Sequence, residues 1–165
     1  MDRITTVIAS LNDPLITAVS LAINDKVIFI ALIAILIFLF EKRTEKILKI
    51  FLVLLTAFVL ASAAKEVLGL ERPCDSAVAK IQCPDDFSFP SNHAALAFTL
   101  ALAFINKKTY PMLMGFAILT AFSRIYLGVH TFEDVVGGLV IAPIAYQTIE
   151  IFWRNKEEKP WEKKK

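Results

Sequence analysis

The chain has 165 residues, a length that predicts a single domain. Its residues are 56% hydrophobic, more than the roughly 45–50% of soluble globular domains, and they gather in long uncharged runs as in membrane proteins. The formal net charge of +2 is too small to favour nucleic acid, so we expect no nucleic-acid partner.

The first segment, residues 2–23, alternates apolar and polar positions and is interrupted at Asn12, Asp13 and Pro14. This pattern predicts one or two short amphipathic helices that lie in the membrane interface. A transmembrane helix is the weaker interpretation, because a charge and a proline stand in its middle. The segment lacks the basic start and the cleavage site of a secretory signal, so we expect it to be retained.

Five long apolar runs follow, each with the composition of a transmembrane helix. None shows the alternation of a membrane β-strand, and only helices or closed barrels cross a bilayer. The sequence therefore predicts an all-α fold, a polytopic membrane bundle of about five transmembrane helices. The expected spans are residues 23–40, 50–64 with a helical continuation to about 70, 94–105, 110–122 and 135–153.

The basic residues predict how this bundle lies in the membrane. Those of residues 41–49, of the lysine pair at 107–108 and of the charged tail 154–165 share one side if the spans alternate. We expect that side, with the C-terminus, to be the cytoplasmic side of the cell membrane. The extracytoplasmic side then receives segments 65–93 and 123–134, which hold both histidines of the chain. One domain of residues 1–165 results, with an interfacial part (1–23), a bundle (24–153) and the tail.

Three cations stand near helix ends on the side of the histidines. Lys65 and Arg72 are seven residues apart, so both would point the same way if the helix continued through them. Arg124 follows Ser123 at the end of the fourth expected span. Positive charges held at fixed positions favour an anionic ligand.

Two further segments complete this group of polar residues. Ser91, Asn92 and His93 open a helix, whose N–H groups and positive dipole end attract an anion. His130 and Asp134 are four residues apart, so on one helical turn the carboxylate reaches the imidazole.

Cations, a hydroxyl and N–H donors are the groups that neutralise charge on a transferring phosphoryl group. A neutral imidazole can attack phosphorus while a carboxylate sets its tautomer, and a second histidine can protonate the leaving oxygen. Each residue alone has a structural explanation, such as a snorkelling lysine or a plain helix cap. Their conjunction at membrane depth, where ionisable groups are costly, favours a functional site.

The combined pattern resembles the three signature motifs of the type 2 phosphatidic acid phosphatase (PAP2) superfamily. All three occur in the expected order, and the joint pattern is specific although each motif alone is weak. The matching strings are Lys65-(six residues)-Arg72-Pro73, Pro90-Ser91-Asn92-His93 and Ser123-Arg124-(five residues)-His130-(three residues)-Asp134.

The resemblance implies a membrane lipid phosphatase that needs no metal or other cofactor. His130 would be the nucleophile that forms a phosphohistidine, Asp134 would orient and activate it, and His93 would be the general acid. The residues that would bind phosphate are Lys65, Arg72, Ser91, Arg124 and, through its backbone N–H, Asn92.

The substrate is less well defined than the reaction. The family commonly has glycine where this chain has Asn92, and short bacterial undecaprenyl diphosphate phosphatases can carry a polar residue there. This favours a polyprenyl diphosphate over the alternatives, phosphatidylglycerophosphate and phosphatidate. An alternative of another class is a protein that binds or transports a lipid phosphate without chemistry.

The loop between the second and third expected spans contains both cysteines, Cys74 and Cys83. They are too few for the usual four-ligand zinc site. A disulfide and two free thiols remain as alternatives, and the disulfide requires an oxidising compartment. Asp85 and Asp86 in the same loop are interpreted as solvated side chains.

Overall fold

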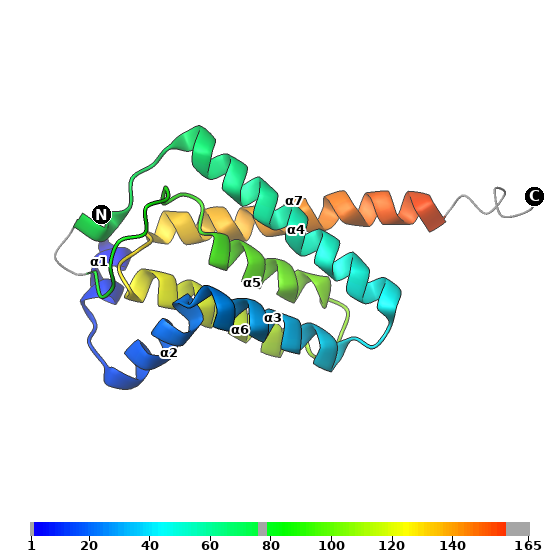
Figure 1. Cartoon of the computed structure of the whole chain (residues 1–165), viewed down its shortest axis with the longest axis horizontal. Helices are drawn as coiled ribbons and strands as arrows, with labels where there is room; N and C mark the ends of the chain where they lie inside the picture. The colour runs from blue at the N-terminus through cyan, green and yellow to red at the C-terminus, as the bar shows by residue number, and fades with distance from the viewer. Residues whose placement is uncertain (1, 76–78, 158–165) are drawn as a thin grey trace, which may run out of the picture.

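The computed structural model describes residues 2–75 and 79–157, and that part of the chain forms seven α-helices and no β-strand (Figure 1). The prediction of an all-α fold is confirmed. Because α7 continues into the expected tail, only residues 158–165 of the tail lie outside the described residues. The helices are α1 (Arg3–Ser10), α2 (Pro14–Asn24), α3 (Lys26–Phe40), α4 (Thr44–Leu68), α5 (Asn92–Ala103), α6 (Tyr110–Tyr126) and α7 (Phe132–Glu157), with a 3-10 helix at Pro73–Asp75.

The N-terminal segment forms two short helices, which break where the sequence is interrupted. The Asp13 carboxylate accepts the N–H groups of Leu15 and Ile16 at 2.9 Å each, and Pro14 takes the first helical position, where no N–H is needed. The axes of α1 and α2 meet at 111°. Both helices pack against α6, where the Tyr126 hydroxyl donates to the Asp13 carbonyl at 3.0 Å. Their position in the membrane interface stays a prediction.

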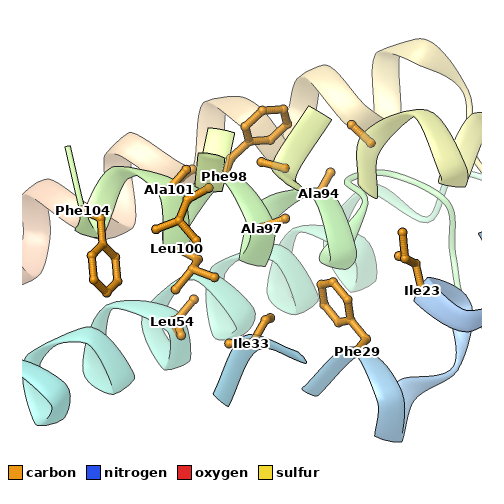
Figure 2. Close-up of a cluster of buried hydrophobic side chains, with 14 of the residues drawn as sticks. Ile23, Phe29, Ile33, Leu54, Ala94, Ala97, Phe98, Leu100, Ala101 and Phe104 are labelled. Carbon is orange, nitrogen blue, oxygen red and sulfur yellow. The ribbon is translucent and has the colours of Figure 1, made fainter. Parts of the chain in front are cut away.

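Helix α5 lies at the centre of the bundle and packs against α4, α6 and α7. Many of its buried residues are alanines, and small side chains let neighbouring helices approach closely. Figure 2 shows the core beside it, to which Phe29 and Ile33 of α3, Leu54 of α4 and Leu100 of α5 contribute. This burial fixes the position of the α5 N-terminus, which begins at Asn92.

Loops at one end of the bundle connect the end of α4 to the start of α5 and the end of α6 to the start of α7. Backbone hydrogen bonds join these loops: the Ser91 N–H donates to the Asp134 carbonyl at 2.9 Å, and the Lys80 N–H donates to the Leu127 carbonyl at 3.0 Å. The segments that carry the two histidines therefore meet at one end, as the alternating order of the spans predicts.

The helices differ in whether they are long enough to cross a membrane. Two helices of the described residues, α4 and α7, are long and apolar enough to cross a bilayer, and a third span results if the bent pair α1–α2 counts as one. Helices α3 and α5 have 15 and 12 residues, so they rise about 22 and 18 Å, short of a hydrocarbon core of about 30 Å. The count of five spans is therefore not confirmed.

The outer surface is nevertheless apolar. Large hydrophobic side chains stand exposed along α3, α4 and α7, among them Val27, Leu55 and Ile151. An exposed apolar surface of this extent fits contact with lipid. A membrane protein is therefore the coarse assignment that the structure supports.

Gly138 lies where α7 crosses α5 with almost no space between the backbones. A Cβ at this position would lie 2.8 Å from the Ala95 nitrogen and 2.9 Å from the Ser91 carbonyl oxygen. We expect Gly138→Ala to lower the free energy of unfolding by about 1–3 kcal/mol, because backbone atoms cannot move aside as a side chain can.

Gly115 of α6 is the matched control, since a Cβ there would meet no atom within 4 Å. Gly115→Ala is expected to be neutral or to stabilise by up to about 1 kcal/mol. Thermal unfolding of the detergent-purified variants measures both effects. A midpoint for Gly138→Ala at or above the wild-type value would contradict the close crossing of α5 and α7.

Candidate active site

His130 and Asp134 form the buried centre of the site. The His130 side chain is 2% exposed, and its Nδ1 lies 3.2 Å from Asp134 Oδ2. The same carboxylate oxygen accepts the Thr131 N–H at 2.7 Å and the Ser88 hydroxyl. Three donors on one oxygen hold the carboxylate, and through it the imidazole, in one orientation.

Arg72 contacts the other ring nitrogen of His130. Its Nη1 lies 3.0 Å from His130 Nε2 and also donates to the Val129 carbonyl at 2.7 Å. Because a guanidinium only donates, Nε2 must be the acceptor and Nδ1 must carry the proton that Asp134 accepts. Burial, opposed in part by the hydrogen bond to Asp134, lowers the pKa of His130. The ring is therefore neutral, with its lone pair on the nitrogen beside the cation.

Helix α4 ends close to its expected end near residue 70, before it can include Arg72. It stops at Leu68, where Gly69 adopts a left-handed conformation with φ 57°, which glycine takes without steric cost. Lys65 is thus in the last turn of α4, whereas Arg72 lies in the loop beyond it. The two cations share one site, but not as two turns of a continuous helix.

A loop carboxylate joins these two cations. Asp86 Oδ2 lies 3.2 Å from Lys65 Nζ, and Asp86 Oδ1 lies 2.7 Å from Arg72 Nη2. Partial burial raises the pKa of Asp86, but the hydrogen bond and charge of Arg72, and then the charge of Lys65, outweigh it, so this pKa lies below its usual value. Asp86 is a half-exposed loop residue, but it also contacts both cations, which the sequence did not indicate.

The N-terminus of α5 brings the middle motif to the same place. Ser91 caps the helix, and its hydroxyl accepts the Ala94 N–H at 3.5 Å. The ring of His93 lies 4.5 Å from that of Phe29, centroid to centroid. His93 Nε2 is buried and has no hydrogen-bond partner among the described residues. A buried polar atom without a partner is costly, which fits a group that meets a ligand.

The side chain of Asn92 turns towards α4. Its Nδ2 lies 3.5 Å from the Ser62 hydroxyl, while its Oδ1 has no partner in the described part of the protein. This contact fits a role in which the backbone N–H of Asn92, and not its side chain, faces an anion.

The Arg124 side chain on α6 is buried, and a residue of the N-terminal segment accepts a hydrogen bond from it. Its Nη1 donates to the Asn24 Oδ1 at 2.6 Å, and its Nε is buried without a partner over the described ranges. Asn24, like Ser88, was missed by sequence reasoning. Asn24 and Arg124 are 100 residues apart in the sequence, so no local spacing pattern could have linked them.

Cys74 and Cys83 form a disulfide, with their Cα atoms 5.6 Å apart. The bond closes the loop that carries Asp86 onto the short 3-10 helix after Arg72. Among the described residues, no group of three or more His, Cys, Asp or Glu side chains could hold a metal ion.

The sequence and the fold are both similar to those of known phosphatases. The putative undecaprenyl-diphosphatase YbjG of Escherichia coli is 38% identical over 81 residues, which are 47% of this chain and 41% of that protein. Sphingosine-1-phosphate phosphatase 2 of Homo sapiens is 34% identical over 97 residues, which are 52% of this chain and 24% of that protein. The chain thus spans less than half the length of either relative.

The fold is also similar to a solved structure. A crystal structure of a transmembrane PAP2 type phosphatidylglycerolphosphate phosphatase from Bacillus subtilis aligns with a TM-score of 0.71 and 24% identity, over 96% of this chain and 85% of that chain. The family model of the PAP2 superfamily matches residues 46–157, which include α4 except for its first two residues, α5, α6, α7 and all three motifs. The chain therefore belongs to the PAP2 superfamily.

Proposed function

We propose that this protein is a membrane phosphatase that hydrolyses a lipid phosphate or diphosphate through a phosphohistidine on His130. The observation that carries the proposal is the pair of contacts on one buried imidazole. Asp134 accepts its Nδ1 proton, and Arg72 stands beside its Nε2 lone pair. A nucleophile needs this polarity, and the cation beside it marks where the negative charge of the substrate would lie.

In the first step, the Nε2 lone pair of His130 attacks phosphorus and forms a P–N bond. The P–O bond to the leaving lipid alcohol or lipid phosphate breaks, and His93, which enters this step as the imidazolium beside the anionic substrate, gives its proton to the departing oxygen. Asp134 stabilises the positive charge that develops on the imidazole. Arg72 now donates to a phosphate oxygen in place of Nε2, and Lys65 and Arg124 neutralise the remaining charge.

In the second step, water attacks the phosphorus of the phosphohistidine. His93, left without its proton, accepts one from this water, and the P–N bond breaks. The products are inorganic phosphate and the regenerated neutral imidazole. The Nδ1 proton remains on the hydrogen bond to Asp134 throughout, so the ring keeps one tautomer.

The preferred substrate is a polyprenyl diphosphate. The support is the Asn92 position and the 38% identity to a putative undecaprenyl-diphosphatase. The other relative is named for sphingosine 1-phosphate, so related chains differ in headgroup. Phosphatidylglycerophosphate and phosphatidate are the alternatives. A protein that binds or transports a lipid phosphate without chemistry would not need the ordered contact between His130 and Asp134.

Phosphate release by the detergent-purified protein tests the proposal, with a chelator present. The substrates are a polyprenyl diphosphate, phosphatidylglycerophosphate, phosphatidate and sphingosine 1-phosphate. Release that is fastest with the diphosphate supports both the reaction and the preferred substrate. Faster release from a monophosphate would support the proposed reaction but refute the preferred substrate. No release from any of the four lipids would contradict the proposal that the protein is a phosphatase.

The orientation in the membrane is a proposal that the disulfide makes testable. With the site on the extracytoplasmic face, Cys74 and Cys83 should react with a membrane-impermeant thiol reagent in intact cells after mild reduction. Before reduction the two sulfurs are bonded, so labelling should be weak, and the double variant Cys74→Ser/Cys83→Ser is the control without a target. Labelling that requires opening the membrane would reverse the orientation.

A further inference from the structure

Asp86 occupies the position of an anion in the candidate site. Its two carboxylate oxygens bind separate cations, Oδ2 to Lys65 at 3.2 Å and Oδ1 to Arg72 at 2.7 Å. The side chains of these cations are 4% and 6% exposed. Both belong to the residues proposed to bind phosphate, so the carboxylate and a phosphate compete for the same donors.

A carboxylate resembles one edge of a phosphate group. Both present two oxygens in a plane to a guanidinium or an ammonium group, and both are recognised by the same bidentate geometry. A phosphate with two negative charges forms stronger contacts with these cations than a carboxylate with one. A bound phosphate would therefore displace Asp86 instead of adding to it.

The carboxylate is placed so that it can leave. Its side chain is 49% exposed, and ion pairs with a solvated partner contribute little to stability. The Asp86 carbonyl separately accepts the Arg72 Nε–H at 2.8 Å. That backbone contact can keep the loop in place while the side chain rotates into solvent.

We propose that Asp86 is an affinity-determining residue, an intramolecular anion that fills the phosphate subsite when no substrate is bound. Substrate must displace it, which weakens apparent phosphate binding, and its return after turnover helps to expel inorganic phosphate. The inference rests on the proposed function for the phosphate-binding roles of Lys65 and Arg72 and for the identity of the substrate.

The opposing explanation is that Asp86 only positions the two cations. Under that explanation, removal of the carboxylate loosens Lys65 and Arg72 and weakens phosphate binding. Under the competition proposed here, removal of the carboxylate empties the subsite and strengthens phosphate binding. The two explanations therefore predict opposite signs for the same substitution.

The experiment compares the dissociation constant of inorganic phosphate for the wild-type protein, Asp86→Asn and Asp85→Asn by equilibrium dialysis in detergent. Asp85 is the matched control, an exposed neighbour with the same charge outside both ion pairs. If the carboxylate fills the subsite about nine-tenths of the time, Asp86→Asn should lower the dissociation constant about tenfold. Asp85→Asn should change it by less than about twofold, because exposed charges are screened.

In turnover assays, inhibition by added phosphate should strengthen by the same factor in Asp86→Asn, with a lower KM for the lipid. Unchanged or weaker phosphate binding in Asp86→Asn, no measurable binding in either protein, or equal tightening in Asp85→Asn would overturn the proposal. A wild-type protein that releases no phosphate from any lipid would refute the proposed function, while the dialysis comparison would still decide the role of Asp86.

Discussion

Replacement of His130 by alanine is expected to reduce phosphate release by at least about a thousandfold, as loss of an enzyme nucleophile commonly does. The reason is that no other side chain in the described residues presents a lone pair between Arg72 and Asp134. Turnover of the lipid by the purified variant measures the effect. His130→Asn serves as a second variant, because it fills more of the buried space and keeps a polar group there.

His93 offers a sharper comparison than loss of activity alone. If it protonates the leaving oxygen, the first step of His93→Ala, measured as the initial burst of released leaving group, should be strongly impaired on a lipid phosphate but much less on an aryl phosphate, whose leaving group needs no proton. His130→Ala should be inactive on both substrates. Equal recovery of the two variants on the aryl phosphate would contradict the separate roles, and near-normal activity of folded His130→Ala would refute the nucleophile.

Asp134→Asn should lower kcat by about a hundredfold to ten-thousandfold, the range expected when the carboxylate beside a catalytic histidine becomes an amide. Its Oδ2 accepts from His130, Ser88 and the Thr131 N–H. An amide loses the charge and presents either a weaker acceptor or an NH₂ group to these donors. The imidazole then loses the interaction that fixes its tautomer.

Glu133→Gln is the matched control for this variant. It makes the same chemical change one residue earlier in the first turn of α7, at an exposed position. Its kcat should stay within about twofold of the wild type, because surface substitutions away from a site have small effects. Comparable losses in the two variants, or a folded Asp134→Asn protein with normal kcat, would show that the contact with His130 is not catalytic.

The sequence predicts best the relations that are local along the chain. The contact between His130 and Asp134 is present at the predicted spacing of four residues, although His130 lies in the loop just before α7, which begins at Phe132. The convergence of both histidines follows from helices of alternating direction. Neither inference requires knowledge of how side chains pack.

Relations that depend on packing or on loops could not be predicted in this way. Nothing near Asn24 in the sequence indicates that it holds Arg124, since α2 and α6 meet only in the folded bundle. The loop before α5 has no periodicity, so Asp86 resembles any solvated carboxylate until the fold brings it to Lys65.

The predicted number of spans is not confirmed for a related reason. Apolar runs mark helices, but their composition does not fix where each helix ends. Loops and caps shorten α3 and α5 to less than the thickness of the hydrocarbon core. Composition therefore predicts a membrane location and a helical fold more reliably than it predicts the number of membrane crossings.

The most direct test of the covalent mechanism is to quench steady-state turnover of a lipid labelled with ³²P in its transferred phosphate and to locate the label on the protein. Labelled phosphate on His130, stable in base, labile in acid and absent from His130→Asn, is the expected result. Turnover without any labelled protein under rapid quenching, or label on another residue, would contradict the account.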